Sequence, residues 1–331
     1  MTPIAPEITA FLRQRLAIER GASPNTCDSY AYAFQLLFAF ASRRLRVAPS
    51  DLQLEQLDAA LVLSFLDHLR TKRGNSATTR NTRLTAIKSF MRFIEYRKPG
   101  ALEQVRQILA LPMHRTDRPL VRHLTQPECQ ALLDTPDPTT RLGIRDRAMI
   151  HLGLAGGLRV SELVGIYRDE VTFDGHLVDL RVRGKGRKER RLRLWKAVAA
   201  SLRAWMAVRG DVAAPELFVN AWNKPLTRYG FTRSLAGYVE AATGSCPSLR
   251  AKKVSPHTLR HTCAMNVLAA TRDIRKVALW LGHASTETAE KFYLPADPMQ
   301  KLEALAAATP AALRPGKFTP PDRLIASLRG T

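Results

Sequence analysis

The sequence predicts a mainly α-helical protein with a small β-sheet, an α+β fold in two domains. Apolar residues recur at helical spacing through most of the first ~110 residues and again after residue 123. Residues 177–194 instead alternate apolar and polar side chains, as the two strands of a hairpin do. Residues 113–122 lose this periodicity and carry Pro119 among basic side chains, which is typical of an interdomain linker. A length of 331 residues also fits two domains.

The first predicted domain, residues 1–112, contains helices with recognisable starts. Ser23 is a good N-cap, Pro24 suits the first helical position, and an apolar stripe follows. Ser76 can cap a later helix, whose inward stripe should hold Leu84, Ile87, Met91 and Ile94. Its basic residues fall mainly on other faces. Such a face is often only solvated, but in so basic a chain we favour DNA contacts by Arg80, Arg83 and Lys88.

The second predicted domain spans residues 123–308 and is followed by a proline-rich tail, residues 309–331. Thr125 resembles an N-cap and Glu128 completes its capping box, so helices should resume there. The strand of residues 177–183 and the one that holds Leu192 and Leu194 should form a hairpin around a Gly-Lys-Gly turn. The tip of this hairpin is almost entirely basic.

The charge of the chain favours a polyanionic partner. Lys and Arg number 51 against 29 Asp and Glu, a formal net charge of +22. Binding to DNA or RNA releases condensed counterions, which makes such an excess favourable. The chain has no apolar run of 18 residues and no signal-peptide pattern at its start, so we expect a cytoplasmic protein without a membrane partner. A hydrophobic content of 45% indicates packed cores rather than a ribosome-like polybasic chain.

The cysteines predict neither a disulfide framework nor a metal site. They are widely spaced, without a Cys-x-x-Cys pair or a partner His at zinc-finger spacing: Cys27, Cys129, Cys246 and Cys263. We also find no Gly-x-x-x-x-Gly-Lys-Ser/Thr loop for a nucleotide and no clear carboxylate set for two metals. We therefore expect no cofactor.

Six residues in the second half form a set suited to phosphodiester chemistry. Arg159 lies in Gly-Gly-Leu-Arg-Val-Ser-Glu-Leu, Lys185 in the hairpin turn, His257 and Arg260 in His-Thr-Leu-Arg-His, His283 in Leu-Gly-His, and Tyr293 ten residues further on. Two guanidiniums can each bind the oxygens of a phosphate under attack, and Arg stays protonated at any workable pH. A phenol can serve as the nucleophile if cationic neighbours or a base assist it.

In this order and these settings, the motifs resemble the tyrosine recombinase (phage integrase) family, in its bacterial mobile-element or Xer-like branch. The resemblance covers residues from about 4 to 306 and is strongest over residues 152–297. It implies an N-terminal helical core-binding domain and a catalytic domain that form a C-shaped clamp around DNA. It also implies strand exchange without metal or ATP, through a 3′-phosphotyrosyl intermediate and a Holliday junction.

The resemblance also implies roles for single residues. Tyr293 would be the nucleophile, and His257 would act in proton transfer or phosphate binding, whereas His261 would be only a neighbour. Lys185 would be the general acid, although Lys188 is close enough to be confused with it. Arg187, Lys188 and Arg190 could contact phosphates without taking part in catalysis. The ten residues from His283 to Tyr293 exceed the nine of many family members, which leaves the pose of Tyr293 open.

The sequence also allows expectations for the partner and the biological role, with alternatives that stay open. The expected partner is double-stranded DNA at a specific site, bound by a homotetramer on paired sites, with or without related recombinases. We expect a bacterial protein, nucleoid-associated when bound, that integrates or transposes a mobile element. The alternatives are an Xer-like dimer resolvase, a type IB topoisomerase and a non-enzymatic helix-turn-helix protein. The last would use residues 274–281, a turn at residues 282–283 and a helix from Ser285 onward. In similar recombinases the C-terminal segment docks onto a neighbouring subunit, and we expect the same of this tail.

Overall fold

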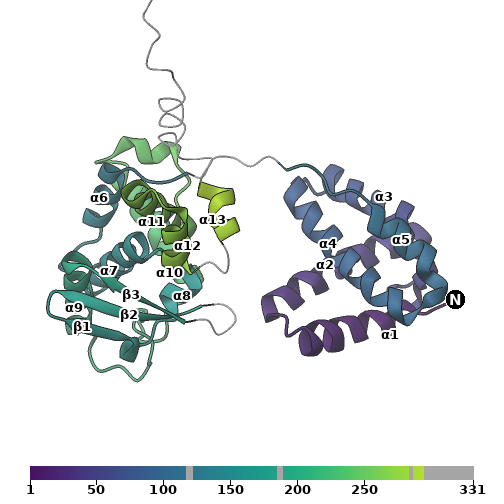
Figure 1. Ribbon diagram of the computed structural model, residues 1–331, viewed down its shortest axis with the longest axis horizontal. Coiled ribbons are helices and arrows are strands. Elements are labelled where there is room, and N and C mark those ends of the chain that lie inside the picture. Colours follow the sequence, from purple (N-terminus) through teal and green to yellow (C-terminus); the bar gives the residue numbers. More distant parts are fainter. Residues whose placement is uncertain (117–121, 185–188, 283–285, 294–331) are drawn as a thin grey trace, which may run out of the picture. The chain divides into compact units, whose positions relative to one another are not determined.

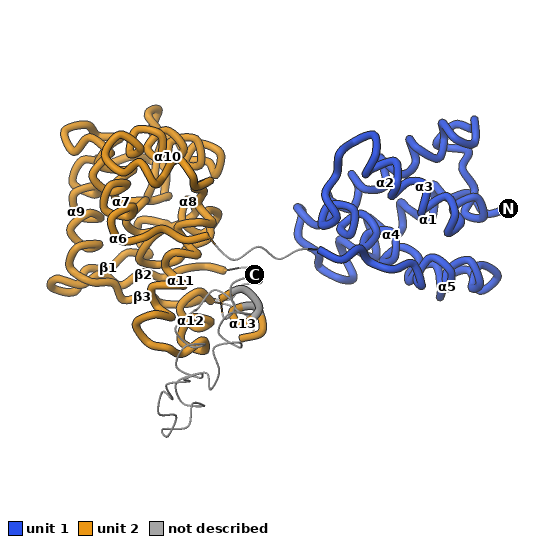
Figure 2. Tube along the Cα trace, turned by 90° about the horizontal axis from the view of Figure 1, so that it is seen from above, with its two compact units in different colours: residues 1–118 blue, residues 119–331 orange. Residues whose placement is uncertain are grey.

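The computed structural model describes residues 1–116, 122–184, 189–282 and 286–293. The chain divides into two compact units, residues 1–118 and 119–331, drawn in different colours in Figure 2. Each unit has a core of its own, formed by buried apolar side chains. The two units are therefore described one after the other.

The first unit is helical, with starts where the sequence predicts them. The Ser23 and Ser76 hydroxyls each accept a hydrogen bond of 3.3 Å from the backbone N–H three residues on, that of Thr26 and of Thr79. Short 3₁₀ turns at residues 49–51, 54–56 and 99–101 join the longer helices. Their bounds are α1 Ile4–Thr9, the π-helical η1 Ala10–Glu19, α2 Pro24–Leu45, α3 Ala59–Thr71, α4 Ala77–Arg97 and α5 Leu102–Ala110.

Aromatic rings from three segments form the centre of the first core. Phe11 of η1 meets Phe34 of α2 edge-on with ring centroids 6.0 Å apart, and Phe90 of α4 at 5.5 Å. The predicted inward stripe of α4 is fully buried, which confirms its assignment: Leu84, Ile87, Met91 and Ile94. The apolar faces of α2 and α4 thus pack on each other and leave their polar faces outside.

The second unit places a small sheet among helices (Figure 1). The predicted capping box is present at its start, where the Thr125 N–H donates to Glu128 Oε2 at 2.7 Å. The bounds are α6 Gln126–Asp134, α7 Arg141–Gly156, α8 Val160–Val164, β1 Val171–Asp174, β2 Leu177–Arg183, β3 Glu189–Leu194, α9 Lys196–Arg209, α10 Arg228–Ala242, α11 Pro256–Thr271, α12 Ile274–Leu281 and α13 Thr286–Tyr293. Further 3₁₀ turns lie at residues 168–170 and 247–251.

The sheet is antiparallel in the order β1-β2-β3. The predicted hairpin is confirmed, with Leu180 opposite Leu192 and Val182 opposite Arg190. The alternating apolar residues of β2 are buried, and α9 packs against this strand. Strand β1 has only four residues and too short a pattern to be predicted from the sequence. The fold class, mainly α with a small β-sheet, is confirmed.

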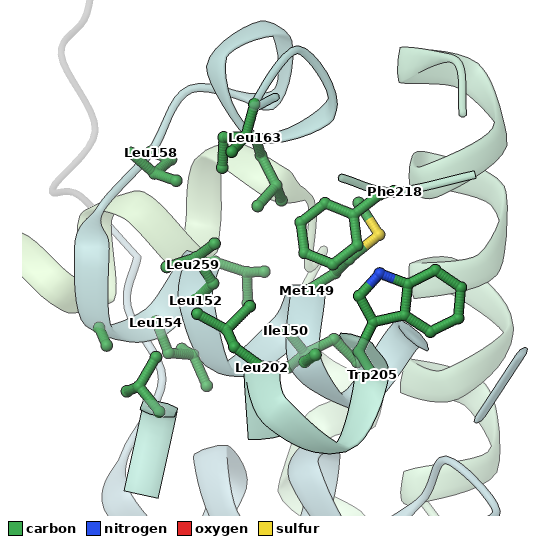
Figure 3. Packing of buried hydrophobic residues seen from close by; sticks show 14 of the residues in the cluster. Met149, Ile150, Leu152, Leu154, Leu158, Leu163, Leu202, Trp205, Phe218 and Leu259 are labelled. Carbon is green, nitrogen blue, oxygen red and sulfur yellow. The ribbon is translucent and has the colours of Figure 1, made fainter. Parts of the chain in front are cut away.

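The core of the second unit is built around α7. Met149 and Ile150 of α7 pack near Trp205 of α9 and Phe218, as Figure 3 shows. The Trp205 indole N–H donates to the Leu217 carbonyl at 2.9 Å, so the buried polar atom of this ring is satisfied. This core fixes α7, and the C-terminal end of α7 leads directly to the residues of the candidate site. No helix among the described residues has the length and apolar character needed to cross a bilayer.

Candidate active site

A glycine turn brings Arg159 to its place. Helix α7 ends at Gly156, and Gly157 adopts a left-handed conformation with φ of 59°. A Cβ atom on Gly157 would lie 2.5 Å from Leu281 Cδ2 and 3.0 Å from Cys263 Sγ, so a larger residue would disturb the packing. The turn therefore joins α7 to α8 beside Cys263 of α11 and Leu281 of α12. Arg159 follows as the residue before α8.

The carboxylate of Glu162 links two arginines. Arg159 Nη1 lies 2.7 Å from Glu162 Oε1, and the Arg159 backbone N–H donates to Oε2 at 3.0 Å. Arg190 of β3 approaches the same carboxylate with Nη2 at 2.9 Å from Oε2 and Nη1 at 3.3 Å from Oε1. The Glu162 side chain is 4% exposed, whereas that of Arg159 is 36% exposed. Glu162 thus fixes the Arg159 side chain and leaves part of the Arg159 guanidinium open to a ligand.

Arg260 is buried beside Glu162 and its two arginines. Its Nη1 donates to the Gly157 carbonyl at 2.5 Å and its Nη2 to the Leu281 carbonyl at 2.9 Å. Nη1 also lies 3.9 Å from Glu162 Oε2. Arg260 therefore ties the ends of α7 and α12 to α11 and approaches the Glu162 carboxylate. We call Arg159, Glu162, Arg190 and Arg260 together the arginine cluster.

The pKa values of the arginine cluster reflect its excess of positive charge. Burial and, after it, the charge of the nearby Arg159 lower the pKa of Arg260 to about 10. Burial alone would raise the pKa of Glu162, but hydrogen bonds from Arg190 and from the Arg159 backbone outweigh it, so this pKa lies below its ordinary value. Three guanidiniums share one carboxylate here, which leaves two positive charges to attract an anion.

Tyr293 lies close to the arginine cluster at the end of α13, which packs beside α12 (Figure 1). The Tyr293 hydroxyl lies 3.0 Å from His261 Nδ1, and the two rings meet edge-on. Only 2% of Tyr293 is exposed. Burial raises its pKa to about 12, although the charges of Arg260 and Arg159 work in the opposite direction. The phenol is therefore protonated at neutral pH.

His257 occupies the exposed start of α11. Pro256 takes the first helical position as predicted, and the Ser255 N–H donates to Thr258 Oγ1 at 3.1 Å. His257 is exposed, and its ring lies 6.4 Å from that of His261 one turn further on. A helix N-terminus favours an anion nearby. Arg159, His257, Arg260 and Tyr293 are thus brought into one region of the second unit.

Comparisons with known proteins identify the family. The sequence profile of the phage integrase family matches residues 122–299, and that of the phage integrase N-terminal SAM-like domain matches residues 8–98. The chain belongs to the phage integrase family of tyrosine recombinases. Members of this family are site-specific DNA recombinases.

Relatives of this tyrosine recombinase cover nearly all of its length. A Sinorhizobium fredii protein, y4rC, whose name describes it as an integrase/recombinase, is 43% identical over 98% of this chain and 97% of its own. Tyrosine recombinase XerC of Myxococcus xanthus is 33% identical over 88% of this chain and 94% of its own.

Solved structures share the fold. The XerH recombinase in a post-cleavage complex with its difH substrate superposes with a TM-score of 0.66 at 22% identity, over 87% of this chain and 81% of that one. A Tn1549 transposon integrase with circular-intermediate DNA gives 0.70 at 14% identity, over 93% and 100%.

Several predicted site residues of the recombinase lie outside the described residues: Lys185, Arg187, Lys188 and His283. Arg190, for which we predict a phosphate contact, has its guanidinium on Glu162 in this structure, which contains no DNA. Gly282, with φ of 65°, passes close to this side chain: a Cβ there would lie 2.9 Å from Arg190 Cδ. Arg190 is therefore part of the arginine cluster, where its role is to fix Glu162.

The predicted DNA contacts in the first unit all have partners within that unit. Arg80 Nη1 lies 3.0 Å from His114 Nε2. Arg83 donates to the Ser29 carbonyl at 3.2 Å and stacks over the Tyr32 ring at 4.9 Å. The Lys88 ammonium donates to the Leu109 and Leu111 carbonyls at the end of α5, and burial lowers its pKa. Lys88 therefore has a structural role in this conformation.

Two residues of the site were not singled out for a role by the sequence motifs. Glu162 follows Arg159 by three residues, which is the spacing of a capping box, and this signal could have predicted their contact. His261 follows His257 by four residues and so shares its helix face, but its contact with Tyr293 spans 32 residues and leaves no local signal. Among the described residues, no group of His, Cys, Asp or Glu side chains is arranged to hold a metal ion.

We predict that Glu162→Gln destabilises the second unit by about 3 kcal/mol, because it leaves buried guanidiniums without their carboxylate. The folded-state pKa of Glu162 is below its ordinary value of 4.5. Its charge therefore contributes stability above that pH, and the contribution is lost as the pH falls through the lowered pKa. Urea unfolding of both proteins from pH 7 to pH 3 should show the difference between them shrinking below about pH 4.5. A difference independent of pH would contradict this assignment.

Proposed function

We propose that this recombinase cuts DNA by attack of Tyr293 on the scissile phosphodiester. Attack would form a 3′-phosphotyrosyl bond and release a 5′-hydroxyl. Exchange of strands between two duplexes would then pass through a Holliday junction. The observation that carries this proposal is the position of Tyr293. Its phenol lies close enough to Arg260 and Arg159 for their charges to act on its pKa. These cations would stabilise the charge that develops on the phosphate.

Arg159 and Arg260 are the proposed ligands of the scissile phosphate. A guanidinium has five N–H donors, and the carbonyl bonds of Arg260 use two of them. Arg159 contacts Glu162 with Nη1 and is partly exposed, so it too has donors to offer. The net positive charge of the arginine cluster supports the binding of a phosphate by both residues. Desolvation makes such contacts stronger than they would be in water.

The remaining roles rest on the motifs. Lys185, with Lys188 as the alternative, would donate a proton to the departing 5′ oxygen. His257 and His283 would complete the contacts to the phosphate. The covalent intermediate keeps the energy of the phosphodiester, so rejoining would need neither a nucleotide nor a metal ion. We propose that the enzyme has no cofactor.

Both units would bind the same double-stranded DNA. In this proposal residues 1–112 are the core DNA-binding domain, residues 113–122 the linker, residues 123–308 the catalytic domain and residues 309–331 the tail. Arg80 and Arg83 would supply phosphate contacts from the first unit, Lys88 would do so only if it left the end of α5, and Arg187 and Lys188 would act from the hairpin. Because one subunit carries one Tyr293 and complete exchange cuts four strands, four protomers would act on paired sites.

We propose integration or transposition of a mobile element as the biological role. The 43% identity to y4rC over nearly the whole length of both chains supports this role. The 33% identity to XerC is lower, and an Xer-like resolution of chromosome or plasmid dimers is the alternative. Recombination of a plasmid pair that carries the DNA flanking the gene, compared with a pair that carries the chromosomal terminus site, distinguishes the two roles.

We predict that Tyr293→Phe abolishes cleavage and leaves DNA binding intact, because the substitution removes only the nucleophilic oxygen. The measurement is denaturing electrophoresis with a nicked suicide substrate that carries the cognate site. The wild-type protein should form a covalent adduct and the variant none. An adduct that persists in the variant would place the nucleophile elsewhere.

We predict that Arg159→Ala lowers the cleavage rate by ~10²-fold or more, as expected for the loss of a strong transition-state donor. Affinity for the site should fall much less, since many other basic residues contact the backbone. Arg203→Ala is the matched control: this exposed arginine of α9 lies over the Phe173 ring and bonds the Gly175 carbonyl, outside the arginine cluster. Equal losses of binding and cleavage for Arg159→Ala would make Arg159 an ordinary phosphate contact.

A further inference from the structure

The contact between His261 and Tyr293 indicates a second catalytic group. His261 Nδ1 lies 3.0 Å from the Tyr293 hydroxyl oxygen, and the imidazole meets the phenol edge-on with centroids 5.8 Å apart. When the imidazole proton is on Nε2, Nδ1 accepts a hydrogen bond from the phenol. A nucleophile and a base within hydrogen-bond reach are the usual geometry of an activated nucleophile.

Deprotonation of Tyr293 is the difficult part of the attack. With a pKa of about 12, only about one phenol in 10⁵ is ionised at pH 7. Burial lowers the pKa of His261, and the charges of His257 and Arg260 lower it further, so this imidazole is neutral at pH 7. A neutral imidazole is able to accept a proton, whereas the arginines around Tyr293 are not.

The two histidines of the His-Thr-Leu-Arg-His motif lie in different surroundings. His257 is exposed at the start of α11, and a helix N-terminus favours an anion nearby. His261 is partly buried one turn later and contacts the phenol. Among the described side chains, the Tyr293 hydroxyl is hydrogen-bonded to His261 alone. The geometry therefore separates a histidine suited to the phosphate from one suited to the nucleophile.

We propose, on the basis of the proposed function, that His261 is the general base that activates Tyr293. As the bond between the phenol oxygen and phosphorus forms, the O–H bond of Tyr293 breaks and its proton moves to His261 Nδ1. The bond between phosphorus and the 5′ oxygen breaks, and that oxygen takes a proton from the general acid. On rejoining, the 5′-hydroxyl attacks phosphorus and returns its proton to the general acid. The bond between phosphorus and the phenol oxygen breaks, and His261 returns its proton to that oxygen.

The buried position of Tyr293 fits this role. At 2% exposure the phenol is shielded from water, so a phosphodiester must displace neighbouring groups to reach it. Helix α13 carries Tyr293, whereas His261 and Arg260 belong to α11. The base is thus fixed on the same helix as a proposed phosphate ligand, which holds the two at a fixed distance from each other.

The test separates proton transfer from mere positioning. In His261→Asn the side-chain oxygen can occupy the place of Nδ1 and accept the same hydrogen bond, but it is not basic. We expect this variant to cleave a suicide substrate ~10²-fold more slowly or worse, within the range of general-base catalysis. Replacement of Tyr293 by a ring-fluorinated tyrosine lowers the phenol pKa, and it should restore at least ~10-fold of the lost rate in His261→Asn. A structural defect would not respond to fluorine.

His151→Asn is the matched control. His151 is a partly buried histidine of α7 whose Nδ1 contacts the Ser201 hydroxyl at 3.0 Å, outside the arginine cluster. This variant should cleave at the wild-type rate. Binding to the cognate site is measured for every variant to show that it is folded, and His261→Gln replaces His261→Asn if the latter does not bind.

The outcomes distinguish a failure of the role of His261 as base from a failure of the proposed function. A wild-type rate for His261→Asn, or a slow rate that fluorinated tyrosine does not improve, would overturn the role of His261 as base while the wild-type adduct upholds the proposed function. Absence of an adduct with the wild-type protein on its cognate site would refute the proposed function itself, and the inference with it.

Discussion

The carboxylate of Glu162 is the contact on which the geometry of the arginine cluster depends. Without it, three guanidiniums from separate segments would repel one another in a largely buried place. With it, Arg159 and Arg190 are held on the two oxygens of one side chain, and Arg260 lies 3.9 Å away. The carboxylate neutralises only one of three charges, so the cluster is stable enough to form and still attracts a phosphate.

The residues of the arginine cluster come together where the ends of α7 and α12 meet α11. The glycine turn after α7 places Arg159 just before α8, where it contacts Glu162, and presents the Gly157 carbonyl to Arg260. The end of α12 offers the Leu281 carbonyl to the same guanidinium. Arg260 thus satisfies buried carbonyls at two helix ends, a structural task that also fixes its own position. Binding and stability are coupled here, and substitution of Arg260 would affect both.

Short-range signals were sufficient to predict much of the fold. Caps such as Ser76 and the hairpin of β2 and β3 depend on residues a few positions apart, so sequence spacing reports them. The arginine and tyrosine motifs were recognised through family resemblance, and the structure brings them together. What the sequence could not show are contacts between distant segments. Arg190 meets Glu162 across 28 residues and His261 meets Tyr293 across 32, and only tertiary packing creates such pairs.

A crystal structure of the Tyr293→Phe variant bound to its uncleaved recombination site tests the central claim most directly. The account predicts that Arg159 and Arg260 each place a guanidinium nitrogen about 3 Å from non-bridging oxygens of the same phosphate, with Glu162 still on Arg190. His261 should lie beside the edge of the phenylalanine ring that replaces the nucleophile. A scissile phosphate held by other residues, with Arg159 and Arg260 turned away from it, would contradict the account.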